Sequence, residues 1–227
     1  MMREIVIDTE TTGLNYKGGD RIIEVGCVEL ANHVPTNRTL QFYCYVDKTI
    51  SEGAQKISGI SNEFLKDEKK FSEHYSSFVD FIKNDTLIIH NADFDVGFIN
   101  NELKLIGKEP IKNKIIDTVP LARKVLNSRI ANLDYLCRRF GIDLGKRKLH
   151  GALLDAELLA EVYLELKGGK QFSMDLSLNK AKEKFSKNKN TQNKNKIVKI
   201  KASEQDTRLH KTMVEGIKGA EWKKYNY

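Results

Sequence analysis

The chain has 227 residues and a mass of 26.0 kDa, and 40% of its residues are apolar and 30% charged. This length suits one ordinary domain with an appendage or two small domains, and the apolar content excludes a wholly disordered chain. The longest apolar runs span a few residues, which excludes a membrane helix of roughly 20 residues. The start of the chain lacks the apolar stretch of a secretory signal. The three scattered cysteines predict neither a disulfide framework nor a zinc site, so we expect a cytoplasmic protein.

The positive charge lies at the C-terminal end. The net charge of +7 divides into −1 for residues 1–170, with 24 basic against 25 acidic residues, and +8 for residues 171–227, with 14 against 6. A basic segment can bind nucleic acid by releasing counterions from phosphates. However, Lys and Asn are abundant along the whole chain, which favours a solvated linker shaped by an AT-rich genome. Both interpretations stay open.

In chain order, the first elements are strands. Runs rich in β-branched residues predict strands at Glu4–Asp8, Arg21–Leu30 and Arg38–Val46, with a turn at Ala31–Asn37 between the last two. Because short connections join these strands, we expect an antiparallel meander.

From residue 71 onward, helical and strand patterns alternate. Apolar spacing predicts helices at Phe71–Lys83, from about Phe94 to Ile106, and at Val119–Val125, Leu133–Phe140 and Leu153–Leu166, with strands at Thr86–Ile89 and Ile115–Ile116. Antiparallel strands followed by this alternation predict an α/β fold with a mixed five-stranded sheet flanked by helices. We assign residues 1–169 to this domain.

The rest of the chain has a different character. Residues 179–202 are rich in Lys, Asn, Ser and Gln and predict a flexible basic linker. Residues 203–227 open with a capping box at Ser203–Asp206. Apolar residues then recur every four positions at Leu209, Met213 and Ile217, and Trp222 follows. An isolated helix of this length is marginal in water, so we expect it to fold against a partner.

Three motifs carry the chemistry. The first is the run from Asp8 to Gly13, where Asp8 and Glu10 project from the same face of a strand. Two adjacent carboxylates repel each other unless a cation neutralises them, and Mg²⁺ or Mn²⁺ is the simplest choice. A solvated strand end is the plainer interpretation. A haloacid-type phosphatase is disfavoured, because it would place Asp at both positions.

The second motif runs from His90 to Phe98, where a core strand gives way to a helix. It contains Asp93 and Asp95, and acids in a first helical turn also serve as caps. Asn91 fits a turn residue equally well.

The third motif is His150–Ala156. On one continuous helix, His150 and Asp155 would lie roughly 140° apart. They converge only if His150 lies on the loop before the helix and Asp155 one turn inside it. Asp155 interrupts an apolar stretch, and a buried carboxylate needs a partner. A surface histidine with a structural role is the plainer interpretation of His150.

Taken in order, Asp8, Glu10, Asp95, His150 and Asp155 resemble the DEDDh 3′–5′ exonucleases, whose fold is ribonuclease H-like. The resemblance covers about residues 3–168. The wording of all three motifs is most similar to the epsilon (proofreading) subunits of bacterial DNA polymerase III. In that alignment Asp95 is the motif acid, and Asp93 is a cap or a neighbouring charge.

The resemblance implies a set of roles. Asp8, Glu10 and Asp155 would ligate a metal, with Asp95 at a second one, and His150 would be the general base. The cofactors would be two Mg²⁺ or Mn²⁺ ions. The substrate-binding residues implied are Asp8, Glu10, Thr11, Gly53, Ile57, Ser58 and Asn91. Ser58 and Gly53 depart from the His and Glu that the family can carry, which puts those two side-chain contacts in doubt.

The resemblance also implies partners. Within residues 170–178, Gln171, Met174 and Leu176 have the spacing of peptides that bind the bacterial sliding clamp. Residues 203–227, with Leu209, Met213, Ile217 and Trp222, lie where the family binds the polymerase alpha subunit.

The implied function is proofreading of a frayed DNA 3′ end. The alternatives are an exonuclease of the same fold that trims RNA and a non-catalytic replisome scaffold. The tail favours the replicase, and five intact motif residues favour an enzyme.

Overall fold

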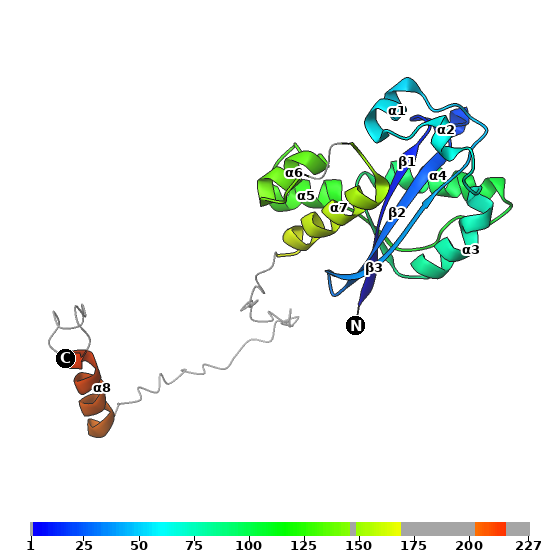
Figure 1. Cartoon of the computed structure of the whole chain (residues 1–227). Helices are drawn as coiled ribbons and strands as arrows, with labels where there is room; N and C mark the ends of the chain where they lie inside the picture. The colour runs from blue at the N-terminus through cyan, green and yellow to red at the C-terminus, as the bar shows by residue number, and fades with distance from the viewer. Residues whose placement is uncertain (1, 146–148, 169–202, 217–227) are drawn as a thin grey trace, which may run out of the picture. The chain divides into compact units, whose positions relative to one another are not determined.

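The structure is a computed structural model that describes residues 2–145, 149–168 and 203–216. It divides into two units, Met1–Leu176 and Ser177–Tyr227, which we describe separately (Figure 1).

The first unit is built on a five-stranded sheet with the order β3-β2-β1-β4-β5. The strands are β1 (Arg3–Thr11), β2 (Ile22–Ala31), β3 (Val34–Tyr43), β4 (Thr86–Ile89) and β5 (Ile115–Asp117). β1 pairs antiparallel with β2, and β2 antiparallel with β3. β4 pairs parallel with β1, and β5 with β4. The predicted mixed sheet and its antiparallel meander are therefore confirmed.

Two strand boundaries differ from the prediction. β1 continues past Asp8 to Thr11. β3 runs from Val34 to Tyr43. It begins before the predicted Arg38 because the connection from β2 is a two-residue turn at Asn32 and His33. Both turn residues have positive φ, 50° and 71°. Such turns match the twist of the flanking strands, so the hairpin closes earlier than the predicted turn at Ala31–Asn37 allows.

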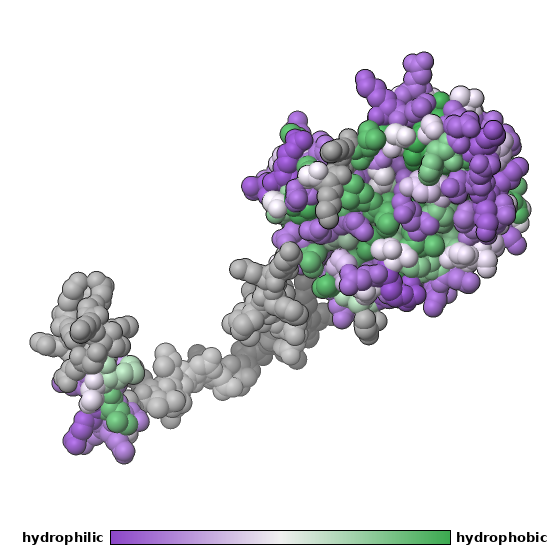
Figure 2. Space-filling view, viewed as in Figure 1, coloured by the Kyte–Doolittle hydropathy of each residue, from purple (hydrophilic) through white to green (hydrophobic). Residues whose placement is uncertain are grey.

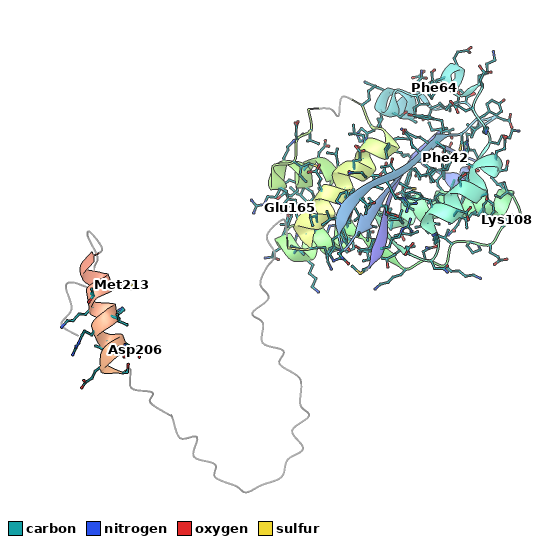
Figure 3. All side chains as sticks on the ribbon, turned by 60° about the horizontal axis from the view of Figure 1, so that its bottom comes forward. Phe42, Phe64, Lys108, Glu165, Asp206 and Met213 are labelled. Atoms are coloured by element: carbon teal, nitrogen blue, oxygen red, sulfur yellow. The ribbon has the colours of Figure 1, made fainter. Side chains whose placement is uncertain are left out.

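Helices cover both faces of the sheet (Figure 1). α3 (Phe71–Ile82) and α4 (Ala92–Leu105) pack against one face. α5 (Thr118–Leu126), α6 (Leu133–Phe140) and α7 (Ala152–Leu166) pack against the other. Alternation along β1 sets this division, since Ile5 and Ile7 join the α3–α4 core while Val6 joins the α7 core. Figure 3 shows Phe42 inside the first core, where it stacks on His74 at 4.4 Å.

Three short elements near the end of β1 were not predicted. They are η1 (Tyr16–Gly18), α1 (Glu52–Ser58) and α2 (Asn62–Leu65). Each is too short to show a helical stripe. The sequence does contain the caps of α1 and α2, because Ser51 and Ser61 accept backbone N–H groups three residues ahead.

The second unit contains α8 (Glu204–Gly216). Ser203 precedes the helix, and its hydroxyl accepts the Asp206 N–H at 3.1 Å. Leu209 and Met213 are 63% and 58% exposed, and Met213 projects from the helix in Figure 3. Apolar side chains also show on this helix in Figure 2. Residues 170–202, with the clamp-type peptide and the linker, lie outside the described residues, as do Ile217 and Trp222. Among the described residues, no helix combines the length and apolar composition needed to cross a membrane.

Candidate active site

The end of β1 brings two of the motif acids together. Asp8 and Glu10 project to the α7 side of the sheet, and Thr9 projects to the α4 side. On β2, Gly26 stands opposite Asp8 and Glu24 opposite Glu10.

The start of α7 supplies the third motif. His150 lies on the loop before the helix and is exposed, and Asp155 lies one turn inside and is 3% exposed. His150 Nδ1 and Asp155 Oδ2 are 3.2 Å apart. Ligand atoms of Glu10, His150 and Asp155 all lie within 4.8 Å of one another. The structure thus gives the two motif residues the loop and helix positions that their convergence requires.

Asp95 reaches the site from α4. It is 3% exposed, and Thr9 Oγ1 donates a hydrogen bond of 2.7 Å to its Oδ1. Burial raises the pKa of Asp95 to about 7, and the Thr9 bond only partly opposes this. Asp93 is exposed in the first turn of α4. A negative charge at this position interacts favourably with the positive end of the helix dipole.

The electrostatics of the cluster favour a cation. Burial raises the pKa of Asp8 well above its usual range, and the charges of Asp95, Asp155, Glu10 and Glu24 raise it further. Carboxylate oxygens are the ligands that Mg²⁺ and Mn²⁺ prefer, and a bound divalent cation would relieve the repulsion. The residues present therefore fit a divalent metal site.

Two cavities adjoin these acids. One of about 290 Å³ contains motif residues and part of α6, and its lining residues are Asp8, His90, Asn132, Leu133, Asp134, His150 and Asp155. The other, of about 260 Å³, is more apolar, and its lining residues are Thr9, Glu10, Thr11, Gly13, Leu14, Ser51, Gly53, Ala54, Ile57 and Phe94. The second cavity includes four of the residues implied to bind the nucleotide: Glu10, Thr11, Gly53 and Ile57.

Asp8 lines the first cavity, and the remaining two implied nucleotide contacts, Ser58 and Asn91, line neither. Ser58 is buried, and its hydroxyl donates to Ala54 O at 3.0 Å, so it is used inside α1. Asn91 caps α4 with a left-handed backbone, φ 63° and ψ 58°, and its N–H donates to Asp117 Oδ1. Neither residue lines the apolar cavity.

Asp117 is a site residue that the sequence analysis missed. Its two carboxylate oxygens accept the N–H groups of Asn91 and Ala92 at 3.2 and 3.1 Å, and Oδ1 also accepts Val119 N–H at 2.8 Å. It therefore fixes the starts of both α4 and α5. An acid directly between a short strand and a helix is an N-cap signal, so the sequence contained the clue.

A hydrogen bond ties the loop that carries His150 to the apolar cavity. The N–H of His150 donates to Ile57 O at 3.0 Å. Next to this bond, Gly59 ends α1 with φ +74°, and a Cβ built there would lie 2.5 Å from Leu149 Cδ1. The helix that lines the cavity thus holds the loop that carries His150.

Comparison with known proteins gives the family. The exonuclease family model matches residues 5–163, a span that contains all five motif residues. A DNA polymerase III subunit epsilon of Rickettsia felis is 41% identical over 222 residues, which cover 95% of this chain and 97% of the relative. The chain belongs to this exonuclease family. The Escherichia coli epsilon subunit is 43% identical over 184 residues, covering 78% of this chain and 75% of that subunit.

Solved structures agree on the fold of the exonuclease domain. The nuclease domain of 3′hExo, a DEDDh family member bound to rAMP, has a TM-score of 0.62 at 19% identity, covering 73% of this chain and 92% of that one. Exonuclease X in complex with 5′ overhanging duplex DNA has a TM-score of 0.58 at 21% identity, covering 72% and 90%. The predicted ribonuclease H-like exonuclease fold is confirmed.

Proposed function

We propose that the chain is the proofreading 3′–5′ exonuclease of a bacterial replicative DNA polymerase and acts in the cytoplasm. The observation that carries the proposal is the convergence of Asp8, Glu10, Asp95 and Asp155 with His150 beside a nucleotide-sized cavity. The naming of the relatives at 41–43% identity as epsilon subunits supports DNA as the substrate.

The acids would hold two divalent cations. Asp8, Glu10 and Asp155 would be the ligands for one ion, and Asp95 would serve the other. Bound Mg²⁺ or Mn²⁺ supplies charge stabilisation for the phosphodiester oxygens and a more acidic water. The 2.7 Å hydrogen bond from Thr9 Oγ1 holds the Asp95 carboxylate at the end of β1.

His150 is suited to the work of a general base. Its imidazole is exposed at the cavity, and its backbone is fixed by Ile57 O. A ring nitrogen of a neutral imidazole can accept a proton, so His150 can take the proton of the attacking water. The 3.2 Å approach to Asp155 orients the ring toward the acids.

The apolar cavity is our site for the terminal nucleotide. Leu14, Ile57 and Phe94 offer apolar surface to a base or sugar, and Thr11, at the end of β1, is a polar residue of the same cavity. A nucleotide must leave the duplex to enter, and a mispaired end melts at lower cost. The site therefore favours mispaired 3′ ends.

A gel assay of primer degradation tests this function. Purified protein is mixed with a 5′-labelled primer–template that carries a 3′ mispair, with Mg²⁺ or EDTA, beside an RNA oligonucleotide. We expect shortening by single nucleotides that needs metal and slows when the end is paired. Strong preference for RNA would move the assignment to RNA trimming. Inactivity on both, with and without polymerase, would favour a scaffold.

We also propose that the tail tethers the nuclease. Gln171, Met174 and Leu176 would bind the sliding clamp, and Leu209, Met213, Ile217 and Trp222 the polymerase alpha subunit. The Rickettsia felis similarity extends over 95% of the chain, so it includes much of the tail, and Leu209 and Met213 are exposed on α8. Two anchors would raise the effective concentration of nuclease near the primer end.

Deletion of residues 196–227 tests the tether. We expect unchanged activity on free DNA and loss of polymerase association in gel filtration. Co-elution of the truncated protein with the polymerase would refute the proposal.

A further inference from the structure

Glu24 is a buried carboxylate beside the active site with no place in the mechanism above. It lies on β2 directly opposite Glu10, so both side chains project to the α7 side of the sheet. Glu24 is 2% exposed. A buried carboxylate without compensation is unfavourable, so its presence calls for a physical reason.

The partners of Glu24 are neutral. Gln41 Nε2 donates to Glu24 Oε1 at 2.8 Å and also to Tyr43 OH at 3.2 Å. Burial raises the pKa of Tyr43, and the charge of Glu24 raises it further. Within the described part of the chain, no Lys, Arg or His forms an ion pair with Glu24. By contrast Glu29, five residues along β2, pairs with both Arg3 and Arg38.

The position of Glu24 places its charge at the metal-binding acids. The start of α7 sits directly on β2, because a Cβ at Gly26 would lie 2.3 Å from the backbone of Ala152 and Leu153. A Cβ at Gly151 would lie 4.0 Å from Glu24 Oε2. The charge of Glu24 is also felt by Asp8. Glu24 is therefore adjacent to both β1 and α7, the two elements that carry Asp8, Glu10 and Asp155.

We propose that Glu24 is a fifth carboxylate of the metal site, a positioning residue whose charge strengthens divalent-cation binding by Asp8 and its neighbours. The inference rests on the proposed two-metal site. Without metal, Glu24 adds to the repulsion in the cluster, and with metal its charge is neutralised by the cations. The same residue therefore destabilises the metal-free protein and stabilises the metal-bound one.

Three variants in the full chain separate charge from shape. Glu24→Gln keeps the size and hydrogen-bonding capacity but removes the charge, and Glu24→Asp keeps the charge. Glu29→Gln is the matched control, since Glu29 is also buried on β2 but paired with arginines on the other face of the sheet. For each protein, Mn²⁺ affinity is measured by calorimetry, and the unfolding temperature is measured in EDTA.

We expect Glu24→Gln to bind Mn²⁺ about tenfold more weakly than wild type and to unfold in EDTA roughly 2–4 °C higher. Glu24→Asp should bind Mn²⁺ nearly as wild type does. Glu29→Gln should bind Mn²⁺ as wild type does and unfold at a lower temperature.

The outcomes distinguish the two proposals. If wild type itself binds no Mn²⁺, the proposed function fails. If wild type binds and Glu24→Gln binds within about twofold of it, the role of Glu24 is overturned. Weaker binding together with a lower unfolding temperature in EDTA would also overturn it, because it would indicate general loosening. An equal loss of affinity in Glu29→Gln would do the same.

Discussion

Carboxylates are buried at both ends of β1, but their negative charge is compensated differently at the two ends. At the N-terminal end, Glu29 pairs with Arg3 and Arg38. Glu4 there accepts the Tyr163 hydroxyl at 2.8 Å and lies 2.6 Å from His33 Nδ1.

At the C-terminal end, the acids Asp8, Glu10, Asp95 and Asp155 gather, and burial, with the charges of the neighbouring acids, raises the pKa of Asp8. Burial alone would raise the pKa of Glu29 too, yet its bonds to Arg3, Thr36 and Arg38 hold that pKa below its usual range. One end therefore holds the sheet together, and the other retains a repulsion that suits it to cations.

The largest effect should follow removal of Asp8. Asp8→Ala should lower exonuclease activity by at least about a thousandfold and abolish Mn²⁺ binding, because Asp8 lies at the centre of the acid cluster. The metal-free variant should be no less stable, since a repelled carboxylate is gone. Activity is followed on a labelled primer and binding by calorimetry.

Asp85→Ala is the control from the other end of the sheet, where Asp85 pairs with Arg3. It should keep both activity and Mn²⁺ binding. Retained Mn²⁺ binding in Asp8→Ala would refute the ligand role of Asp8.

Next in size is the loss of the base. His150→Ala should reduce turnover by about 10²–10³-fold while Mn²⁺ affinity stays close to wild type. The reason is that Asp8, Glu10 and Asp155 remain to hold the metal. Single-turnover kinetics at saturating Mn²⁺ measure the effect. Intact turnover would show that another group removes the proton.

A substitution at the N-terminal end of β1, where Glu29 pairs with arginines, should change the stability of the protein but not its activity. Glu29→Gln should lower the free energy of unfolding by roughly 2 kcal/mol at pH 7, because Arg3 and Arg38 lose their buried partner. Exonuclease activity should not change. Urea denaturation followed by circular dichroism measures the effect.

This loss should depend on pH with a definite sign. The folded-state pKa of Glu29 is lowered, so its contribution is present above the ordinary glutamate pKa and disappears as the pH falls through the folded value. The groups facing it are Arg3 on β1 and Thr36 and Arg38 on β3, with Asp85 beyond Arg3. The difference between wild type and Glu29→Gln should therefore shrink below about pH 4. A constant difference from pH 7 to pH 3 would contradict the ion-pair account.

The smallest effect should come from the contact between α1 and the catalytic loop. Gly59→Ala places a Cβ against Leu149 at a residue with φ +74°, which costs about 1 kcal/mol in backbone strain. Displacement of the loop should lower turnover several-fold and leave Mn²⁺ binding unchanged. Adding Leu149→Ala removes the clash and should restore part of the turnover. A double variant as slow as Gly59→Ala would show that the clash is not the cause.

The sequence predicted the sheet and the site motifs because both depend on local patterns. Strand alternation and the paired Asp8 and Glu10 are visible within a few residues, and the spacing from His150 to Asp155 showed which loop and helix positions would let them converge. The hydrogen bond from Thr9 to Asp95 joins residues 86 positions apart, and no local signal marks it. The sequence did not mark Glu24 either, because its place beside the acids depends on the register of β2 against β1 and on the close packing of α7 on β2.

The short helix α1 shows a different limit. It has too few residues for an apolar stripe, and Ser58, which the family alignment places at the nucleotide, turns its hydroxyl to Ala54 O. Ile57, which the resemblance implies as a nucleotide contact, lines the apolar cavity, but its carbonyl bond to His150 belongs to the backbone and leaves no mark in the side-chain sequence.

Anomalous diffraction from crystals soaked in Mn²⁺ tests the central claim most directly, because it locates the ions. The account predicts anomalous peaks within ligand distance of Asp8, Glu10 and Asp155, with a second ion toward Asp95, and no peak at Glu4 or Glu29. Absence of any peak at the C-terminal end of β1 under saturating Mn²⁺ would contradict the account. A peak at the paired end would contradict it as well.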